Sequence, residues 1–320
     1  MIRCFIIDKE KLIPSKDSNV ENITWCDAVR PTEDELMEIS QRFNIDIDDL
    51  EDCFDETERP RFKVDLILNY SFILLQVPIS EELDINQEQT TYPLGFFLTA
   101  NKKVITIQSI ASPGFEKVIE TINRHAIFDY FFLIIEIFHG LVNEMDKIVK
   151  KFIFYIREIQ NSVLHSQKGS DIKKPFQLNS YLIFYNTAML GNLNSIKSFY
   201  NKNKNVIDGN IALFDKYEDM LIDIEQMYNL TSIYRDVLAN SLDAFSSVIN
   251  NNITTIMKIV ASISLILSIP TLIASVFGMN VYFPGINILN NDIIPFLLIV
   301  IITSLSTALI WVYFRKVKWL

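Results

Sequence analysis

Two long apolar stretches occupy the C-terminal end of the chain. No charged residue occurs in 259–291 or in 293–314. A helix needs about 20 apolar residues to cross a bilayer, so each stretch is long enough to span one. The first stretch ends in FGMNVYFPGINILNN, which is too rich in Gly, Pro and Asn to be helical throughout. The pattern predicts membrane spans at 256–277 and 293–314, joined by a loop at 278–292. A buried helical hairpin in a soluble core is the alternative.

The first third of the chain, 1–112, shows a different pattern. Short apolar or β-branched runs bounded by turn residues are typical of strands, and the capping box formed by Thr32 and Glu35 predicts the start of a helix. The region is therefore predicted to be an α/β domain. The predicted strands are 4–7, 64–68, 71–77, 93–98 and 104–108.

From Pro113 onward the apolar residues recur at helical spacing over long distances. Within 113–205 the pattern predicts helices near 114–124, 126–166 and 176–202, the last of them ending at the Asn-rich segment 201–205.

A final helix is predicted over 211–276, because this segment lacks Gly and holds only one proline, Pro270. At 1.5 Å per residue it would reach about 100 Å. We expect 206–255 to form a stalk that continues into the first span. A helix of this length needs partner helices to bury its apolar face.

The charges are distributed unevenly. The formal net charge is −10, but residues 253–320 hold four basic residues and one acid, which leaves −13 on residues 1–252. An acidic body lacks the basic surface that binds nucleic acid, so no nucleic-acid partner is expected. Basic residues occur at the start of the first span, at Lys258, and after the second span, in the tail 315–320, whereas the loop has no Lys or Arg. By the positive-inside rule this predicts a plasma-membrane protein with both termini in the cytoplasm. The three cysteines, without a CxxC motif, are interpreted as reduced structural thiols.

A line of small and polar residues follows the predicted last helix. Its members are alternately four and three residues apart, so they share one face. Polar residues at membrane depth normally face a bundle interior or a water-filled cavity, and several copies around an axis would form a pore. Close packing through small residues is the alternative. Met257 is the one large apolar member, where a hydrophobic constriction could gate the pore. The line consists of Asp243, Ser247, Asn250, Thr254, Met257, Ala261, Ser264, Ser268, Thr271 and Ser275.

The sequence Phe277-Gly278-Met279-Asn280 stands at the outer end of the first span. In this position, before a second span that ends in basic residues, FGMN closely resembles the signature of the CorA family of magnesium and divalent-cation channels. The resemblance implies an N-terminal cytoplasmic α/β domain of the αβα sandwich type, a long helical stalk, two C-terminal transmembrane helices and a funnel-shaped homopentamer. One departure is that family members often carry a Glu shortly after GMN, which is absent here.

The resemblance also implies roles for individual residues. Asn280 would be the selectivity filter, with Gly278 and Met279 shaping its loop. Mg²⁺ gives up its waters reluctantly, so neutral amide oxygens can select the hydrated ion. The resemblance places Thr271 as a polar ring, Met257 in the gate and Asp243 as an acidic ring at the exit. The other predicted pore-lining residues are Ser268, Ser264, Thr254 and Asn250.

The acidic front contains twelve acids and one base in 33–58. Clustered carboxylates repel one another, and hard divalent cations relieve that repulsion. The resemblance implies that such acids meet stalk acids across subunit interfaces and bind regulatory Mg²⁺. By position the predicted ligands are Asp52 and Asp219, with Glu51 and Asp223 beside them. A solvated charged surface is the alternative.

No motif specific enough to predict catalysis, a bound cofactor or ATP binding was found. Together with this absence, the resemblance to the CorA family implies passive, membrane-potential-driven Mg²⁺ uptake as the leading prediction, with Mg²⁺ as both substrate and regulatory ligand. A divalent ion crossing about 100 mV gains roughly 4.6 kcal/mol. The expected partners are membrane lipid, identical subunits and divalent cations. A Co²⁺, Ni²⁺ or Zn²⁺ transporter of the same family and a membrane-anchored cytoplasmic sensor without transport are the alternatives.

Overall fold

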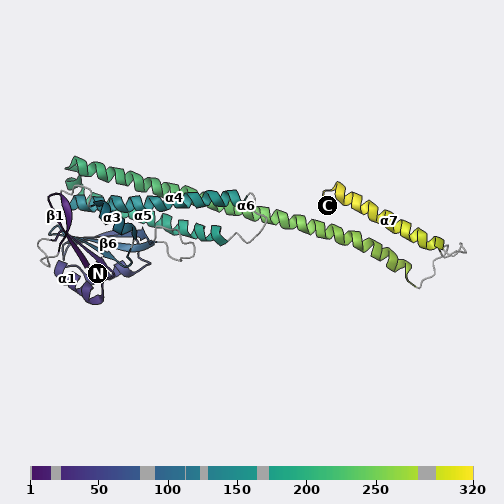
Figure 1. Ribbon diagram of the computed structural model, residues 1–320, viewed down its shortest axis with the longest axis horizontal. Coiled ribbons are helices and arrows are strands. Elements are labelled where there is room, and N and C mark those ends of the chain that lie inside the picture. The colour runs from purple at the N-terminus through teal and green to yellow at the C-terminus, as the bar shows by residue number, and fades with distance from the viewer. Residues whose placement is uncertain are drawn as a thin grey trace. The chain divides into compact units, whose positions relative to one another are not determined.

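The computed structural model of the chain describes residues 2–15, 23–79, 91–111, 113–122, 129–163, 173–279 and 293–319. The chain divides into two units, Met1–Leu242 and Asp243–Leu320. The first unit contains an α/β domain and long helices, and the second contains the C-terminal helices (Figure 1).

Among the described residues of the first unit, seven strands form one mixed sheet in the order β2-β1-β3-β7-β6-β5-β4. Neighbouring strands pair antiparallel except β3 and β7, which are parallel. The strands are β1 (Ile2–Asp8), β2 (Lys11–Ser15), β3 (Trp25–Val29), β4 (Arg61–Asp65), β5 (Tyr70–Pro78), β6 (Thr91–Thr99) and β7 (Val104–Gln108).

Four of the five predicted strands are confirmed, within β1, β5, β6 and β7. The prediction of a strand at 64–68 was wrong at its C-terminal end, because β4 stops at Asp65. The Asp65 carboxylate accepts hydrogen bonds from the amides of Ile67 and Leu68 at 2.8 and 2.7 Å, which closes a turn instead. β2 and β3 were not predicted; in β3 the buried Asp27 interrupts an otherwise apolar run.

Helices cover both faces of the sheet, which confirms the predicted αβα sandwich. Side chains of β5 alternate between two cores: Ile73 and Leu75 belong to one, Phe72 and Leu74 to the other. The smaller core is completed by α1 (Glu33–Phe43) and α2 (Ile47–Glu51), which is followed by the short helix η2 (Asp52–Phe54). The predicted capping box is confirmed: the Glu35 amide donates to Thr32 Oγ1 at 3.3 Å, and the Thr32 amide donates to Glu35 Oε2 at 2.9 Å.

The larger core lies under helix α3 (Pro113–Ile122) and three longer helices. These are α4 (Tyr130–Val163), α5 (Lys173–Asp208) and the first part of α6 (Ile211–Phe277). The predicted end of a helix near residue 202 was wrong, because α5 continues through the Asn-rich segment to Asp208. Asn203 stays helical and donates from Nδ2 to the Phe199 carbonyl at 2.9 Å. Asn210, just before α6, caps the new helix: its Oδ1 accepts a hydrogen bond from the Leu213 amide at 3.3 Å.

Side-chain ion pairs fasten α6 to its neighbours in the first unit. Lys197 Nζ of α5 lies 2.5 Å from Glu225 Oε1 of α6. The ammonium group of Lys216 on α6 pairs with the buried carboxylate of Glu136 on α4. These contacts set the position of the N-terminal part of α6 against α4 and α5.

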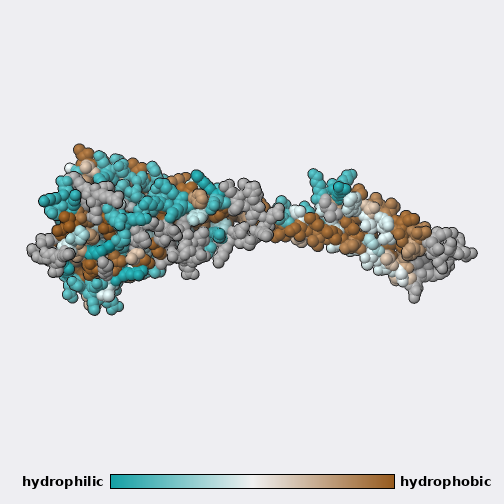
Figure 2. Space-filling model, in the orientation of Figure 1, coloured by the Kyte–Doolittle hydropathy of each residue, from teal (hydrophilic) through white to brown (hydrophobic). Residues whose placement is uncertain are grey.

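α6, with 67 residues, and α7 (Ile293–Lys316), with 24, are the two described helices that are long and apolar enough to cross a membrane. The most apolar windows of the two reach a mean hydropathy of 2.2 and 2.3. Figure 2 shows apolar residues on the surface of the C-terminal helices, and exposed ones include Leu267, Leu272 and Leu305.

Candidate ion pathway and cation sites

The predicted polar line on α6 lies on the surface of the single chain. All ten of its side chains, from Asp243 to Ser275, are exposed. Met257, its one large apolar member, is 66% exposed. Within one subunit nothing among the described residues covers this face.

The opposite face of α6 is covered between Ser262 and Ile273, whereas residues 250–261 are exposed on all sides of the helix. Ser262 is fully buried, and Ile266, Ile269 and Ile273 are partly buried. Each of these residues precedes a member of the line by two positions, which is about 200° around a helix with 3.6 residues per turn. The corresponding members of the line are Ser264, Ser268, Thr271 and Ser275.

Part of the covered face meets α7. A groove of about 440 Å³ is lined by Ile266 of α6 and by residues of α7. The α7 residues are Thr303, Ser304, Thr307, Ala308 and Trp311. The second span therefore packs behind the polar line and leaves it open.

The hydroxyl groups of the line are oriented by their own helix. Thr254, Ser264, Ser268 and Thr271 each donate to the carbonyl four residues earlier, at 2.7 to 2.9 Å. A hydroxyl that donates its proton in this way keeps its oxygen lone pairs as acceptors. These oxygens can accept hydrogen bonds from the water molecules around a cation.

The first two residues of the predicted filter follow the end of α6. The Gly278 amide donates to the Ala274 carbonyl at 2.9 Å, and the Met279 amide to the Val276 carbonyl at 3.4 Å. The Met279 side chain is 59% exposed. Asn280 and the rest of the loop lie outside the described residues.

Asp52, one of the two main predicted regulatory ligands, is half-buried in η2. Its carboxylate pairs with the guanidinium of Arg61, which also pairs with Glu58. Burial raises the pKa of Asp52 and Arg61 opposes this, while the carboxylates of Glu58 and Asp49 raise it further. A cation at Asp52 would therefore compete with Arg61. Glu51, at the end of α2, is exposed.

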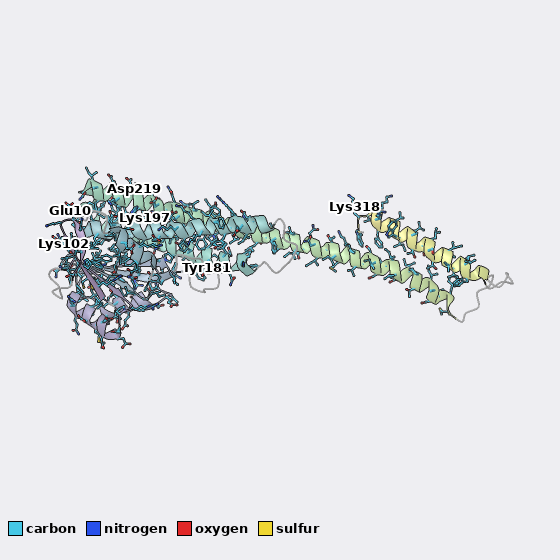
Figure 3. The ribbon with its side chains drawn as sticks, viewed as in Figure 1. Glu10, Lys102, Tyr181, Lys197, Asp219 and Lys318 are labelled. Carbon is cyan, nitrogen blue, oxygen red and sulfur yellow. The ribbon has the colours of Figure 1, made fainter. Side chains whose placement is uncertain are left out.

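Asp219 lies in the first part of α6 (Figure 3) and is exposed, while Asp223, one turn later, is partly buried. Among the described residues of one chain, no three His, Cys, Asp or Glu side chains come close enough together to hold a metal ion. One subunit by itself therefore does not assemble the predicted regulatory site in its described part.

One member of the acidic cluster has a structural role that the sequence did not reveal. Asp49 is buried and accepts hydrogen bonds from Lys63 Nζ at 2.7 and 2.8 Å and from the Tyr70 hydroxyl. Burial and the hydrogen bond to Asp49 raise the pKa of Tyr70. The sequence alone does not pair Asp49 with Lys63 and Tyr70, which lie 14 and 21 residues further along the chain.

A second buried acid, Asp27, was also missed. Its Oδ1 accepts from Thr106 Oγ1 at 2.6 Å and from Gln108 Nε2 at 2.8 Å, and its Oδ2 accepts from Arg3 at 2.5 Å. Burial raises the pKa of Asp27 despite these hydrogen bonds. This network joins β1, β3 and β7 in the middle of the sheet, so its role is structural.

The chain is similar to several known proteins over nearly its whole length. A cobalt/magnesium transport protein CorA of Methanocaldococcus jannaschii is 26% identical over 308 residues, which cover 93% of this chain and 92% of that protein. Another, from Thermotoga maritima, is 24% identical over 324 residues, covering 98% of this chain and 87% of that protein. The complete structure of the CorA magnesium transporter from M. jannaschii matches with a TM-score of 0.82 at 22% identity. It covers 100% of this chain and 99% of that one.

These similarities agree with the FGMN sequence at the end of α6 and with the arrangement of α6 and α7. The family described as CorA-like Mg²⁺ transporter protein matches residues 20–316, which is most of the chain. The chain therefore belongs to the CorA-like Mg²⁺ transporter family.

Proposed function

We propose that the protein is a passive, membrane-potential-driven channel that carries divalent cations, Mg²⁺ above all, into the cell. The observation that carries this proposal is the line of ten exposed residues on α6, on the face opposite the one covered near α7. A helix that only anchors a protein in the membrane does not need a line of polar residues. The names of the similar proteins, which refer to cobalt and magnesium transport, support the same substrate class.

In this proposal five copies of α6 surround an axis and turn their polar lines inward. Hydroxyl and amide oxygens then replace bulk water around a cation that keeps much of its own hydration shell. Asn280 selects at the outer mouth, and a ring of Met257 closes the pore by excluding water. Both termini lie in the cytoplasm of a cell whose plasma membrane the two helices cross, in keeping with the basic residues that flank the spans.

Regulation by internal Mg²⁺ is the finer part of the proposal. Asp52 and Glu51 of one subunit would face Asp219 and Asp223 of the next, because one chain does not gather three such ligands among its described residues. Carboxylate oxygens are the donors that Mg²⁺ prefers, so the residue types fit the ion. Arg61, which already pairs with Asp52, would set how much Mg²⁺ is needed.

The direct test is cation flux in proteoliposomes that contain the full chain. Uptake of Mg²⁺, Co²⁺ and Zn²⁺ is measured with and without an imposed inside-negative potential. We expect Mg²⁺ uptake that rises with the potential and needs no ATP. Asn280→Ala should change the ratio of Mg²⁺ to Co²⁺ uptake, while protein content and oligomeric state stay as in the wild type.

The same experiment separates the other candidate functions. Uptake of Zn²⁺ or Co²⁺ without Mg²⁺ would assign the chain to transition-metal transport within the family. No uptake of any ion, by protein that is pentameric in detergent, would favour a membrane-anchored sensor and contradict the proposed channel.

A further inference from the structure

Two of the three cysteines face each other across neighbouring strands. Cys4 of β1 and Cys26 of β3 are direct partners in the antiparallel register. Their Sγ atoms lie 3.7 Å apart, and both side chains belong to the smaller core beneath α1. Facing residues in antiparallel strands have Cα atoms about 4.5–5.5 Å apart. This separation falls within the range that a disulfide bond spans.

The two thiols differ in their access to solvent. Cys26 is buried, with 1% of its surface exposed, whereas Cys4 is partly exposed. An oxidant in solution can therefore reach Cys4 first, and Cys26 is already in contact with it. The third thiol, Cys53, is fully buried, and its Sγ lies 3.6 Å from the Asp49 carbonyl oxygen.

The surroundings also favour the reactive form of Cys4. The hydrogen bond with Cys26 lowers the pKa of Cys4 to about 7; burial opposes this, Arg42 lowers the pKa further and Glu38 raises it. Both charged residues lie on α1. The hydrogen bond with Cys4 and, after it, burial raise the pKa of Cys26. Near neutral pH the pair thus combines a nucleophilic thiolate with a thiol that keeps its proton.

We propose that Cys4 and Cys26 form a reversible redox site, in which a peroxide converts the two thiols into a cross-strand disulfide. The Cys4 thiolate attacks one peroxide oxygen, the O–O bond breaks, and the sulfenic acid forms with release of hydroxide, which takes up a proton to become water. The Cys26 sulfur then attacks Cys4 Sγ, the S–O bond breaks, and the oxygen leaves as water with the Cys26 proton. Two thiols lose two electrons in total, and one peroxide is reduced to two waters.

The disulfide would tie β1 to β3 covalently. β1 pairs with β2 on its other side, so the bond fastens the β1–β2 hairpin at the end of the sheet to its interior. We expect the oxidised protein to resist local opening at this edge. A thiol reductant restores the free pair, because the exposed side of Cys4 admits it.

Peptide mapping of the full-length protein in detergent tests the proposal. After brief treatment with hydrogen peroxide, the protein is denatured without reductant so that all free thiols are blocked with N-ethylmaleimide. The unreduced protein is then digested with trypsin. The three cysteines fall in three peptides, 4–9, 17–42 and 43–61, since trypsin does not cleave before Pro31 or Pro60. We expect peptides 4–9 and 17–42 to be joined, to separate on reduction, and peptide 43–61 to remain thiol-blocked.

A control variant completes the design. Cys4→Ser should abolish the joined peptide and leave Cys26 as a free thiol. We expect peroxide to raise the melting temperature of the wild type through the cross-link, and not that of Cys4→Ser. The proposal is overturned if Cys4 and Cys26 are both blocked separately after peroxide, if Cys4 is converted to sulfinic acid without a link, or if the bond joins two chains. The experiment measures no transport, so its outcome does not depend on whether the proposed channel function is correct.

Discussion

At the scale of single residues, Asp49 shows how a buried carboxylate holds the α/β domain together. Asp49→Ala would leave the Tyr70 hydroxyl and the Lys63 ammonium without their acceptor. Since Lys63 is partly exposed, we expect the unfolding free energy to fall by about 2–3 kcal/mol. Differential scanning fluorimetry in detergent should record a lower melting temperature. Glu56→Ala, at an exposed acid in the same cluster, is the matched control; an equal effect of both variants would contradict the assignment.

Tyr70 makes the same contact pH-dependent. Its folded-state pKa is raised above the ordinary value near 10. The unfolded chain therefore releases this proton first as the pH rises above 10, so the contribution of Tyr70 to stability is present below pH 10 and declines above it. Tyr70→Phe should lower the melting temperature at pH 8 but flatten its decline between pH 10 and 11.5. If the melting temperatures of the wild type and the variant fall by the same amount between pH 10 and 11.5, the proposed role of Tyr70 is refuted.

The sequence shows a cluster of acids but not which of them are bound within the fold. Asp49 and Asp52 are three positions apart, in the same acidic stretch of sequence, so their sequence neighbours do not distinguish them. They differ because α2 and η2 turn Asp49 toward Lys63 and Tyr70, and Asp52 toward Arg61. These partners are 9 to 21 residues away along the chain. Such contacts depend on strand register, which periodicity alone does not determine.

At the scale of elements, the prediction worked best where one periodic pattern continued for many residues. The span of α6 and its polar line could both be read from the sequence, because a helix repeats its faces every seven residues. β3 was missed since five residues with a buried Asp27 carry no periodic signal. The extent of α5 was underestimated because the tertiary contacts of residues such as Phe199 and Ile207 outweigh the weak helix propensity of its asparagines.

The two faces of α6 give a prediction that separates packing from permeation. Ser262 is fully buried, whereas Ser264 is exposed on the line. Ser262→Leu should overpack the covered face and lower the melting temperature, at a cost of about 1–3 kcal/mol. Ser264→Leu should leave the melting temperature of the chain unchanged but reduce Mg²⁺ flux in proteoliposomes. If Ser264→Leu instead disrupts the oligomer in size-exclusion chromatography, the line serves helix packing rather than a pore.

Met257 gives a prediction about the closed state. A ring of Met257 side chains would exclude water from the narrowest part of the pore, and a serine there would admit it. Met257→Ser should therefore raise the resting leak of Mg²⁺ at high internal Mg²⁺. Ile259→Ser makes a similar change about 200° around the helix and should leave the leak as in the wild type. An unchanged leak in Met257→Ser would exclude a gate at this position.

At the scale of the whole molecule, the acidic front and the pore helix belong to one regulatory proposal. Asp219 lies on α6 itself, so a cation bound there would act directly on the helix that carries the polar line. A solvated charged surface would instead make all exposed acids of α6 equivalent. Glu218 and Asp219 are adjacent and both exposed, so they allow the two explanations to be compared.

Asp219→Lys replaces a proposed Mg²⁺ ligand by a positive charge that repels the ion. We expect this variant to conduct at millimolar internal Mg²⁺, a concentration at which the proposal expects the wild type to be inhibited. Flux is measured in proteoliposomes loaded with increasing Mg²⁺. Glu218→Lys makes the same change of charge about 100° around the helix and should keep normal inhibition. Relief of inhibition in both variants would indicate a general effect of surface charge. Normal inhibition in Asp219→Lys would remove Asp219 from the regulatory site, while the proposed pore would remain, since it depends on the opposite end of the same helix.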